Sequence, residues 1–324
     1  MFFRAATKRW KRRFTPAPVR HSACYERVLG TSLELQILAE SAERGRAAER
    51  VVLQEIDRLE AIFSAYRPDS ELRRWQRTQI SPESVSSELA TVLQAAELWR
   101  QRTENAFHPG VEALTQLWRE GAERGEEPSE ERLLERLDEM RSPLWEVDTA
   151  RQIARRLTHL PVTLNAIAKG YILDCACEMA MRQPGVQAAL LNIGGDIRHL
   201  GEKPVPIHIA DPFSPQENAI PMDTVLLQNR GIATSGNYRR GFQIGERHYS
   251  HLLDPRTGYP VEAVLSASVI AESALLADVL TTAFSVMRPE ESLRFANGLP
   301  DVATLLVSQG RANERNAAWR QRSA

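Results

Sequence analysis

Hydrophobic and polar residues follow two different periods along the chain, and these periods divide it into a helical half and a strand-rich half. Leu33, Leu35 and Ile37 alternate with polar residues, which is the period of a strand with one buried face. Apolar residues then recur every three or four positions over residues 49–63 and again over Ser87–Arg102. The first half is therefore predicted to be mostly helical.

Two shorter helices are expected before the pattern changes. Residues 112–119 have helical spacing, and residues 121–128 form a polar connection that contains glycine. Ser129 is followed by Glu130 and Glu131, as in a helix whose N-cap serine and first-turn carboxylates interact with the unpaired amides. We therefore expect another helix to begin after Ser129.

From residue 162 onward, short apolar runs are separated by glycine and proline, which predicts strands. The strands are expected at residues 188–193, 205–209, 224–227, 242–249 and 265–270. Helices are expected at about residues 166–181 and 273–287. Because the strands follow one another with hairpin-sized gaps, the expected class is α+β, with mixed or antiparallel sheets packed with helices, and not a doubly wound parallel sheet. The two halves are expected to form one compact unit of two subdomains.

Composition and charge exclude several function classes. The 324 residues are 43% hydrophobic with a net charge of -1, which indicates a globular protein without a general attraction to nucleic acid. Basic residues without an acid crowd the first twenty positions, so residues 1–24 are expected to be a basic, disordered leader, whose contact with a membrane or a partner is left open. Residues 25–310 are expected to form the folded domain and residues 311–324 a polar tail.

The sequence contains no export or membrane signal that we recognise. No segment approaches eighteen consecutive apolar residues, and no hydrophobic core of a secretory signal follows the basic start. Cys24, Cys175 and Cys177 are an odd number without paired metal spacing, so they are expected to be free thiols. We expect a cytoplasmic protein.

Chemistry-bearing side chains gather in residues 250–260, which read SHLLDPRTGYP. The segment combines an imidazole, a carboxylate, a guanidinium and hydroxyls with proline and glycine, which fix backbone shape. His251 is either a structural histidine or a general base, since its ordinary pKa lies near neutrality. The stretch is predicted to be part of a functional site.

A second candidate group consists of Asp278 and Thr282, which lie one helical turn apart on an otherwise apolar segment. A carboxylate and a hydroxyl oxygen suit a hard cation such as Mg²⁺, which completes its shell with phosphate and water. The alternative is that Asp278 caps a neighbouring loop.

Lys169 and two glycine-containing turns are the third group. Lys169 is one of four lysines against 37 arginines and lies at a predicted helix start, where a compact positive charge suits phosphate binding. The alternative is a solvated surface lysine. Gly194 and Gly195 end an apolar run, which lets backbone amides approach a ligand closely.

Taken together, these motifs resemble the ApbE family, the FAD:protein FMN transferases, over about residues 26–308. Eight segments in one order argue against chance similarity. They are LGT at 29–31, FSAYRPDSEL at 63–72, NAFHP at 105–109, NAIAKGY at 165–171, LLNIGGD at 190–196, ATSGNY at 233–238, SHLLDPRTGYP at 250–260 and ADVLTTA at 277–283.

The resemblance implies an Mg²⁺-dependent enzyme that splits the pyrophosphate of FAD and attaches FMN to a Thr or Ser of a target flavoprotein, with release of AMP. The acceptor would carry a segment like Asp/Ser-Gly-x-Thr-Ser/Thr. By the same resemblance, the metal ligands would be Asp278, Thr282 and the backbone carbonyl of Ala166, and His251 would be the base for the acceptor hydroxyl. Lys169 would lie beside the pyrophosphate and Tyr66 would stack on the adenine. The remaining FAD contacts would come from Leu29, Ala106, Phe107, His108, Thr163 and Leu252.

The chain differs from the family's usual pattern at two places. His108 stands where the family usually has Asp, and Asn105 and Gly110 replace Gly and Thr around it. Thr163 and Asn165 replace the usual Asp and Gly before the Ala-Lys-Gly segment, which removes a negative charge there. Two other functions use the same residues: an Mg²⁺-dependent FAD pyrophosphatase that gives FMN and AMP, and a non-catalytic FAD-binding module.

Overall fold

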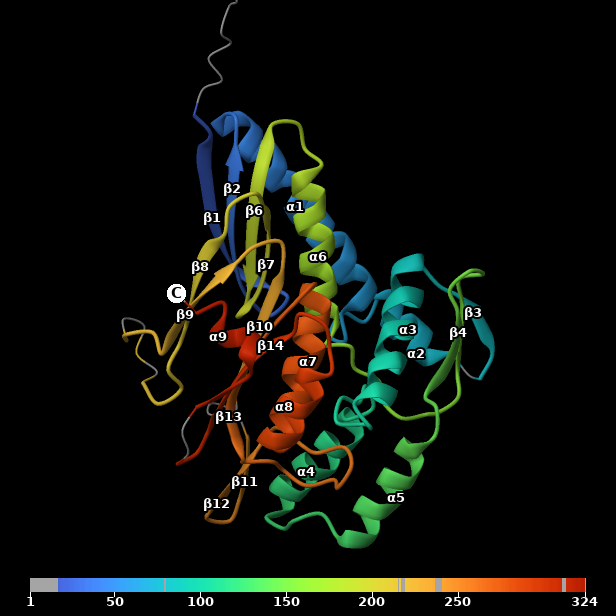
Figure 1. Cartoon of the computed structure of the whole chain (residues 1–324). Helices are drawn as coiled ribbons and strands as arrows, with labels where there is room; N and C mark the ends of the chain where they lie inside the picture. The colour runs from blue at the N-terminus through green and yellow to red at the C-terminus, as the bar shows by residue number, and fades with distance from the viewer. Residues whose placement is uncertain are drawn as a thin grey trace, which may run out of the picture.

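An eight-stranded sheet forms the centre of the computed structural model, which describes residues 17–78, 80–214, 216, 219–236, 241–310 and 313–323 (Figure 1). The pairings between its strands are all antiparallel, which confirms the expected α+β class. The strands are, in order across the sheet, β1 (Val19–Val28), β2 (Thr31–Ala39), β6 (Val186–Ile193), β7 (Asp196–Gly201), β10 (Gly231–Gly236), β13 (Val264–Ala271), β14 (Ala303–Ser308) and β15 (Glu314–Arg315).

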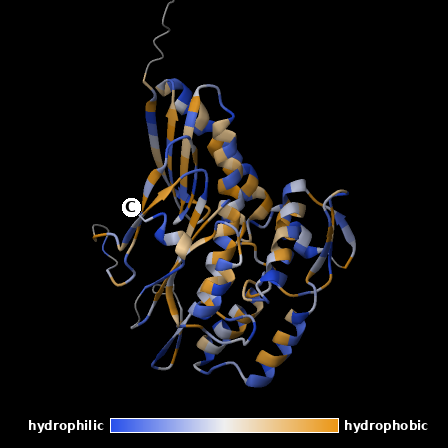
Figure 2. Cartoon of the chain, in the orientation of Figure 1, coloured by the Kyte–Doolittle hydropathy of each residue, from blue (hydrophilic) through white to orange (hydrophobic). Residues whose placement is uncertain are grey.

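Three helices cover one face of this sheet. The alternation seen in the sequence places Leu33, Leu35 and Ile37 of β2 on that face, where each is at most 1% exposed. Figure 2 shows hydrophobic residues along the central strands and along the helices packed against them. The helices are α1 (Ala42–Phe63), α6 (Ala168–Met181) and α7 (Ala274–Val286). Burial of this shared face is the main apolar contribution to the fold.

The opposite face is covered only in part, by a β-hairpin and the C-terminal helix. The hairpin consists of β8 (Val205–Ile209) and β9 (Asp223–Leu227), and the helix is α9 (Ala317–Arg320). Trp319 of α9 is fully buried in this cluster, and its Nε1 donates to Asp223 at 2.9 Å. The expectation of a polar C-terminal tail from residue 311 is therefore wrong for the described residues 313–323, because one tryptophan anchors the segment to the sheet.

The other part of the molecule, formed largely by the first half of the chain, consists mainly of helices and a small sheet. Most of these elements lie beside α6 and α7 in Figure 1. One continuous hydrophobic cluster joins this part to the large sheet, as expected for two subdomains that share a core. The elements are α2 (Glu71–Arg77), α3 (Ser87–Arg102), α4 (Glu112–Arg124), α5 (Glu130–Arg141), α8 (Pro289–Asn297), the three-stranded sheet β3 (Pro82–Ser84), β5 (Ile153–Arg156) and β4 (Trp145–Asp148), and the hairpin β11 (Gly241–Ile244) and β12 (Arg247–Ser250).

Three expected boundaries are wrong, each for a local reason. The single strand expected at 242–249 is a hairpin, because Gly245 has a φ of 58° and turns the chain. The helix expected at 112–119 continues to Arg124 and ends at Gly125, whose φ of 75° gives a left-handed C-cap. Order begins before residue 25, since Val19 already pairs with Ala39; this edge strand has little buried surface and so a faint apolar pattern.

Residues 1–16 of the expected leader lie outside the described residues. Cys24, Cys175 and Cys177 are free thiols, as expected. Within the part of the chain that the structure describes, we find no helix both long and apolar enough to cross a membrane.

Candidate active site

Helices α6 and α7 meet where both begin, and this contact builds the candidate site. A Cβ atom on Gly170 would lie 2.3 Å from the carbonyl oxygen of Ala274, so only glycine permits the approach. Asp174 of α6 accepts hydrogen bonds from the amides of Ala274 and Leu275, both at 2.9 Å, and Arg198 contacts the same carboxylate at 3.0 Å. The start of α7 is thereby fixed to α6.

The next turn of α7 carries Asp278, which is 5% exposed and points back at the first turn of α6. Its Oδ2 accepts a hydrogen bond from the backbone amide of Gly170 at 3.2 Å. Amides in a first helical turn have no partner within their own helix, so Asp278 acts as a cap for α6. Asp278 thus caps the start of a helix and not a loop, and its role as a metal ligand stays a prediction; its Oδ1 has no hydrogen bond to any described residue.

Two further oxygens at this place are suitable for a cation. No backbone amide of the described ranges donates to the carbonyl of Ala166, the residue two positions before α6 begins. Thr281 bonds its hydroxyl to the Ala277 carbonyl at 2.5 Å, whereas the half-buried Thr282 has no such bond with the described residues. The donor set expected for Mg²⁺, with one carboxylate, one hydroxyl and one carbonyl, therefore fits.

Lys169 is not a solvated surface lysine. Its ammonium pairs with the carboxylate of Asp196, which is 3% exposed and begins β7 directly after the turn at Gly194 and Gly195. Both glycines have positive φ, 61° and 99°, which the turn requires. Sequence reasoning missed Asp196 as a site residue, although it ends the LLNIGGD motif.

The charges of Asp278, Asp196 and Lys169 shift one another's pKa values. Burial, together with the neighbouring Asp196 carboxylate, raises the pKa of Asp278 to about 7, although Lys169 acts in the opposite direction. Burial alone would lower the pKa of Lys169, but Asp278 and Asp196 together hold it above its ordinary range, so the lysine stays charged. One half-buried cation beside two buried carboxylates leaves a site that favours an additional positive ion.

The segment that leads into α6 brings other predicted residues to the edge of the site. Thr163 donates its amide to the carbonyl of Pro109 at 2.8 Å, and its hydroxyl accepts from the amide of Asn165 at 3.3 Å. Asn165 Nδ2 lies 3.5 Å from the hydroxyl of Tyr66, whose side chain is 84% exposed. Tyr66 and Thr163 therefore lie near Ala166, with an aromatic ring open to a stacking partner.

Ala106, Phe107 and His108 lie in the core, between 1% and 4% exposed. Their side chains face the protein interior, and His108 is hydrogen-bonded through both ring nitrogens, to Met140 and Gly110. Their predicted contacts with FAD stay predictions. For the His108 ring, the structure defines internal partners instead.

Leu29 lies in the turn between β1 and β2, with a φ of 50°, followed by Gly30 at 77°. Gly194 donates its amide to the carbonyl of Ser32 at 3.2 Å, so this turn lies beside the glycine turn that precedes Asp196. The sequence-predicted groove residue Leu29 is thus placed on the β7 side of the site.

Most polar groups of residues 250–260 hold the segment itself. Arg256 binds both oxygens of Asp254 and also Glu291 at 2.8 Å, and Trp118 Nε1 donates to the Gly258 carbonyl at 2.8 Å. The carboxylate and guanidinium of the motif are therefore structural. His251 and Leu252, both half-buried, directly follow β12; their roles as base and FAD contact stay predictions.

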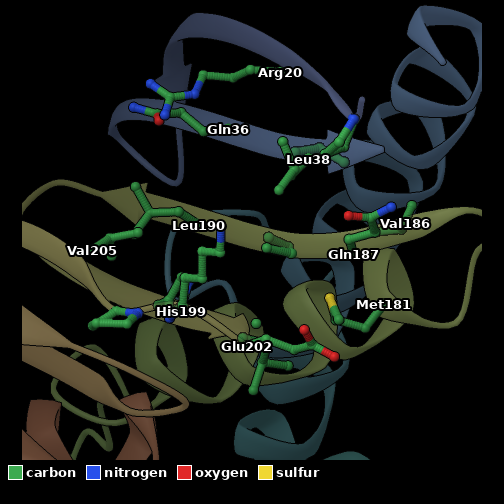
Figure 3. Close-up of a pocket in the computed structure, with 18 of the residues that line it drawn as sticks. Arg20, Gln36, Leu38, Met181, Val186, Gln187, Leu190, His199, Glu202 and Val205 are labelled. Carbon is green, nitrogen blue, oxygen red and sulfur yellow. The ribbon is translucent and has the colours of Figure 1, made fainter. Parts of the chain in front are cut away.

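A broad cavity of about 1090 Å³ lies elsewhere, on the face of the sheet that α6 and α7 do not cover (Figure 3). Its lining includes Gln36, Leu38, Leu190, His199 and Val205. None of the predicted site residues lines it. This cavity is therefore separate from the candidate active site.

Acidic metal clusters are absent from the described residues, where no three or more His, Cys, Asp or Glu side chains could hold an ion together. A cation at the α6–α7 contact would instead use the mixed donor set of Asp278, Thr282 and the Ala166 carbonyl. Such a sparse set is typical of Mg²⁺, which keeps water and substrate phosphate in its shell.

Comparison with known proteins identifies the family and agrees with the fold. The model of the ApbE family matches residues 29–306. An FAD:protein FMN transferase of Haemophilus influenzae is 30% identical and covers 91% of this chain and 89% of its own. This chain belongs to the ApbE family.

Solved structures of the family share the fold. The ApbE protein of Thermotoga maritima superposes with a TM-score of 0.82 at 28% identity, covering 94% of this chain and 100% of its own. The Pseudomonas stutzeri flavinyl transferase ApbE, in its apo form, gives a TM-score of 0.77 at 26% identity, covering 95% of this chain and 99% of its own.

Proposed function

We propose that this chain is an FAD:protein FMN transferase, which moves FMN from FAD to a hydroxyl group of a target protein. The observation that carries the proposal is the α6–α7 contact, where Asp278, the uncapped Ala166 carbonyl and the charged Lys169 meet at a helix N-terminus. That arrangement suits a bound pyrophosphate, because the Lys169 ammonium and an Mg²⁺ ion held there would both offset its negative charge.

Asp278, Thr282 and the carbonyl of Ala166 would hold Mg²⁺. When bound, the ion would neutralise charge on the pyrophosphate oxygens of FAD. The protein residues bind and orient: Lys169, fixed by Asp196, places its ammonium against the phosphate, and the exposed ring of Tyr66 stacks on the adenine.

The acceptor is proposed to be a Thr or Ser in a segment like Asp/Ser-Gly-x-Thr-Ser/Thr. His251 takes the proton from its hydroxyl, the hydroxyl oxygen bonds to the phosphorus of the FMN half, and the bond from that phosphorus to the bridging oxygen breaks. AMP leaves with the bridging oxygen. A base within reach of such a hydroxyl typically accelerates the step by about 10²–10⁴-fold.

The test is to incubate the protein with FAD and Mg²⁺, with and without an acceptor that carries such a segment, and to follow AMP by chromatography. We expect AMP to appear with the acceptor and to depend on Mg²⁺. Equal AMP release without acceptor would identify a pyrophosphatase instead, and FAD binding without AMP under either condition would identify a non-catalytic module.

A further inference from the structure

His108 is a buried imidazole whose two nitrogens have different hydrogen-bonding roles. The amide of Gly110 donates to Nδ1 at 3.0 Å, so Nδ1 carries the lone pair and Nε2 carries the proton. Nε2 donates that proton to the carbonyl of Met140 at 3.0 Å. Burial lowers the pKa of His108 to about 4, so the ring keeps this neutral form near neutral pH.

The Nε2 bond fixes the loop at residues 105–110 to a distant helix, and the Nδ1 bond lies within the loop. Met140 lies at the end of α5, 32 residues further along the chain, and is 2% exposed. The loop also closes tightly on the ring, since a Cβ on Gly110 would lie 3.0 Å from His108 Cε1. A loop residue bonded to the core in this way has little freedom to move.

The loop in turn holds the segment that enters α6. Pro109, between the two bonded residues, accepts the amide of Thr163 at 2.8 Å. Thr163 is followed within three positions by Ala166, whose carbonyl belongs to the candidate metal site, and then by the first turn of α6. A chain of contacts therefore runs from α5 through His108 and Pro109 to the start of the site.

We propose that His108 is a positioning residue, which sets the backbone at residues 163–166 through the bond between Pro109 and Thr163. This inference rests on the proposed function, because that backbone presents Ala166 and adjoins Tyr66. This role acts through the backbone and requires no contact between the His108 ring and FAD or metal.

Four variants separate the bonds from the shape of the ring. His108→Phe keeps the planar shape and removes both hydrogen bonds. His108→Asn keeps an acceptor near the Nδ1 position, and His108→Gln keeps a donor near the Nε2 position. His199→Asn is the matched control, because His199 is also buried, at 1% exposure, yet neither of its ring nitrogens has a partner among the described residues. His199 lies at the separate cavity shown in Figure 3.

The first readout is hydrogen exchange measured by mass spectrometry without any ligand. We expect peptides covering residues 105–111 and 160–168 to exchange at least about tenfold faster in His108→Phe. Local opening costs less free energy in this variant, because the two hydrogen bonds of His108 no longer have to be broken. His108→Asn and His108→Gln should lie between wild type and His108→Phe. His199→Asn should leave both peptides unchanged.

The second readout is the split between KM and kcat for FAD. We expect His108→Phe to raise the KM for FAD by about tenfold, the equivalent of one to two neutral hydrogen bonds, with kcat changed less than about twofold. A wild-type protein that neither binds nor turns over FAD would contradict the proposed function. The hydrogen-exchange measurement needs no ligand, so it would still test whether His108 positions residues 160–168. Wild-type exchange at residues 160–168 in His108→Phe, or equal effects of His199→Asn, would overturn the positioning role.

Discussion

The carboxylate of Asp278 on α7 accepts a hydrogen bond from the backbone amide of Gly170 on α6, at 3.2 Å, across 108 positions of the chain. The contact joins two helix starts and buries an acid. The negative charge of this acid is offset by the N-terminus of α6 and by Lys169, and a bound cation would offset it further. It therefore links the stability of the α6–α7 contact to the chemistry of the site.

The first prediction concerns Asp278→Asn. The asparagine oxygen can still accept from Gly170, whereas the charge that would hold Mg²⁺ is lost. We expect FMN transfer to fall at least about 100-fold, while the free energy of unfolding in urea stays within about 1 kcal/mol of wild type because the buried charge is removed with its bond intact. Transfer assays and urea titrations on the same preparation check both parts. Retained transfer would move the metal away from Asp278.

The second prediction concerns Gly170→Ala. The added methyl group would meet the Ala274 backbone at 2.3 Å, which neither helix can avoid without moving apart. We expect a loss of about 2–4 kcal/mol in the free energy of unfolding. Gly298→Ala is the control, since its added Cβ would have 3.4 Å to the nearest atom and the residue already has a φ of -81°. Equal stabilities of the two variants would show that the helices are not in contact at Gly170.

Part of this site could be predicted from the sequence because the signal is local. The alternation of Leu33, Leu35 and Ile37 predicts the buried face of β2 correctly. Asp278, an acid on an otherwise apolar helical segment, indicates a buried charge that needs a partner. Lys169 stood out by its rarity among the basic residues.

The missing parts depend on partners that are distant in the chain. Asp196 lies 27 residues from Lys169, and nothing near it in sequence indicates the pairing. The strand Pro82–Ser84 has three residues and pairs with Ile153–Arg156, too short a pattern to detect. The resemblance to the family predicts an FAD contact for His108. Its bond to Met140 joins residues 32 positions apart, and no local pattern in the sequence indicates that pairing.

The third prediction is a pH dependence of stability that originates from His108. Its pKa is about 4 in the folded protein and ordinarily 6.5, so between these values the unfolded chain binds a proton that the folded protein does not. Stability from this residue is therefore fully present above pH 6.5 and is lost as pH falls toward 4, at up to about 1.4 kcal/mol per pH unit.

Urea unfolding at pH 7, 6, 5 and 4.5 checks this slope. Arg100 and Glu97 are the charged groups that act on His108, and the pKa of Glu97 lies below its ordinary value. His108→Gln, which cannot titrate, should have the shallower slope. An identical slope in both proteins would contradict the neutral, buried state of the ring.

The fourth prediction concerns His251. If this residue is the base, His251→Ala should lower kcat for transfer by about 10²–10⁴-fold, because the acceptor hydroxyl would keep its proton. FAD affinity, measured by quenching of flavin fluorescence, should change little. A variant that loses FAD affinity and kcat together would indicate a binding role for His251 and not a role as base.

The proposed transfer requires that the acceptor gain FMN on the Thr or Ser of its target segment. Intact-mass spectrometry of an acceptor with an Asp/Ser-Gly-x-Thr-Ser/Thr-like segment, after incubation with FAD, Mg²⁺ and enzyme, measures this. We predict a gain of one FMN on the Thr or Ser of that segment with wild-type enzyme, and none with Asp278→Asn. An unmodified acceptor with the wild-type enzyme, or equal modification by both proteins, would contradict it.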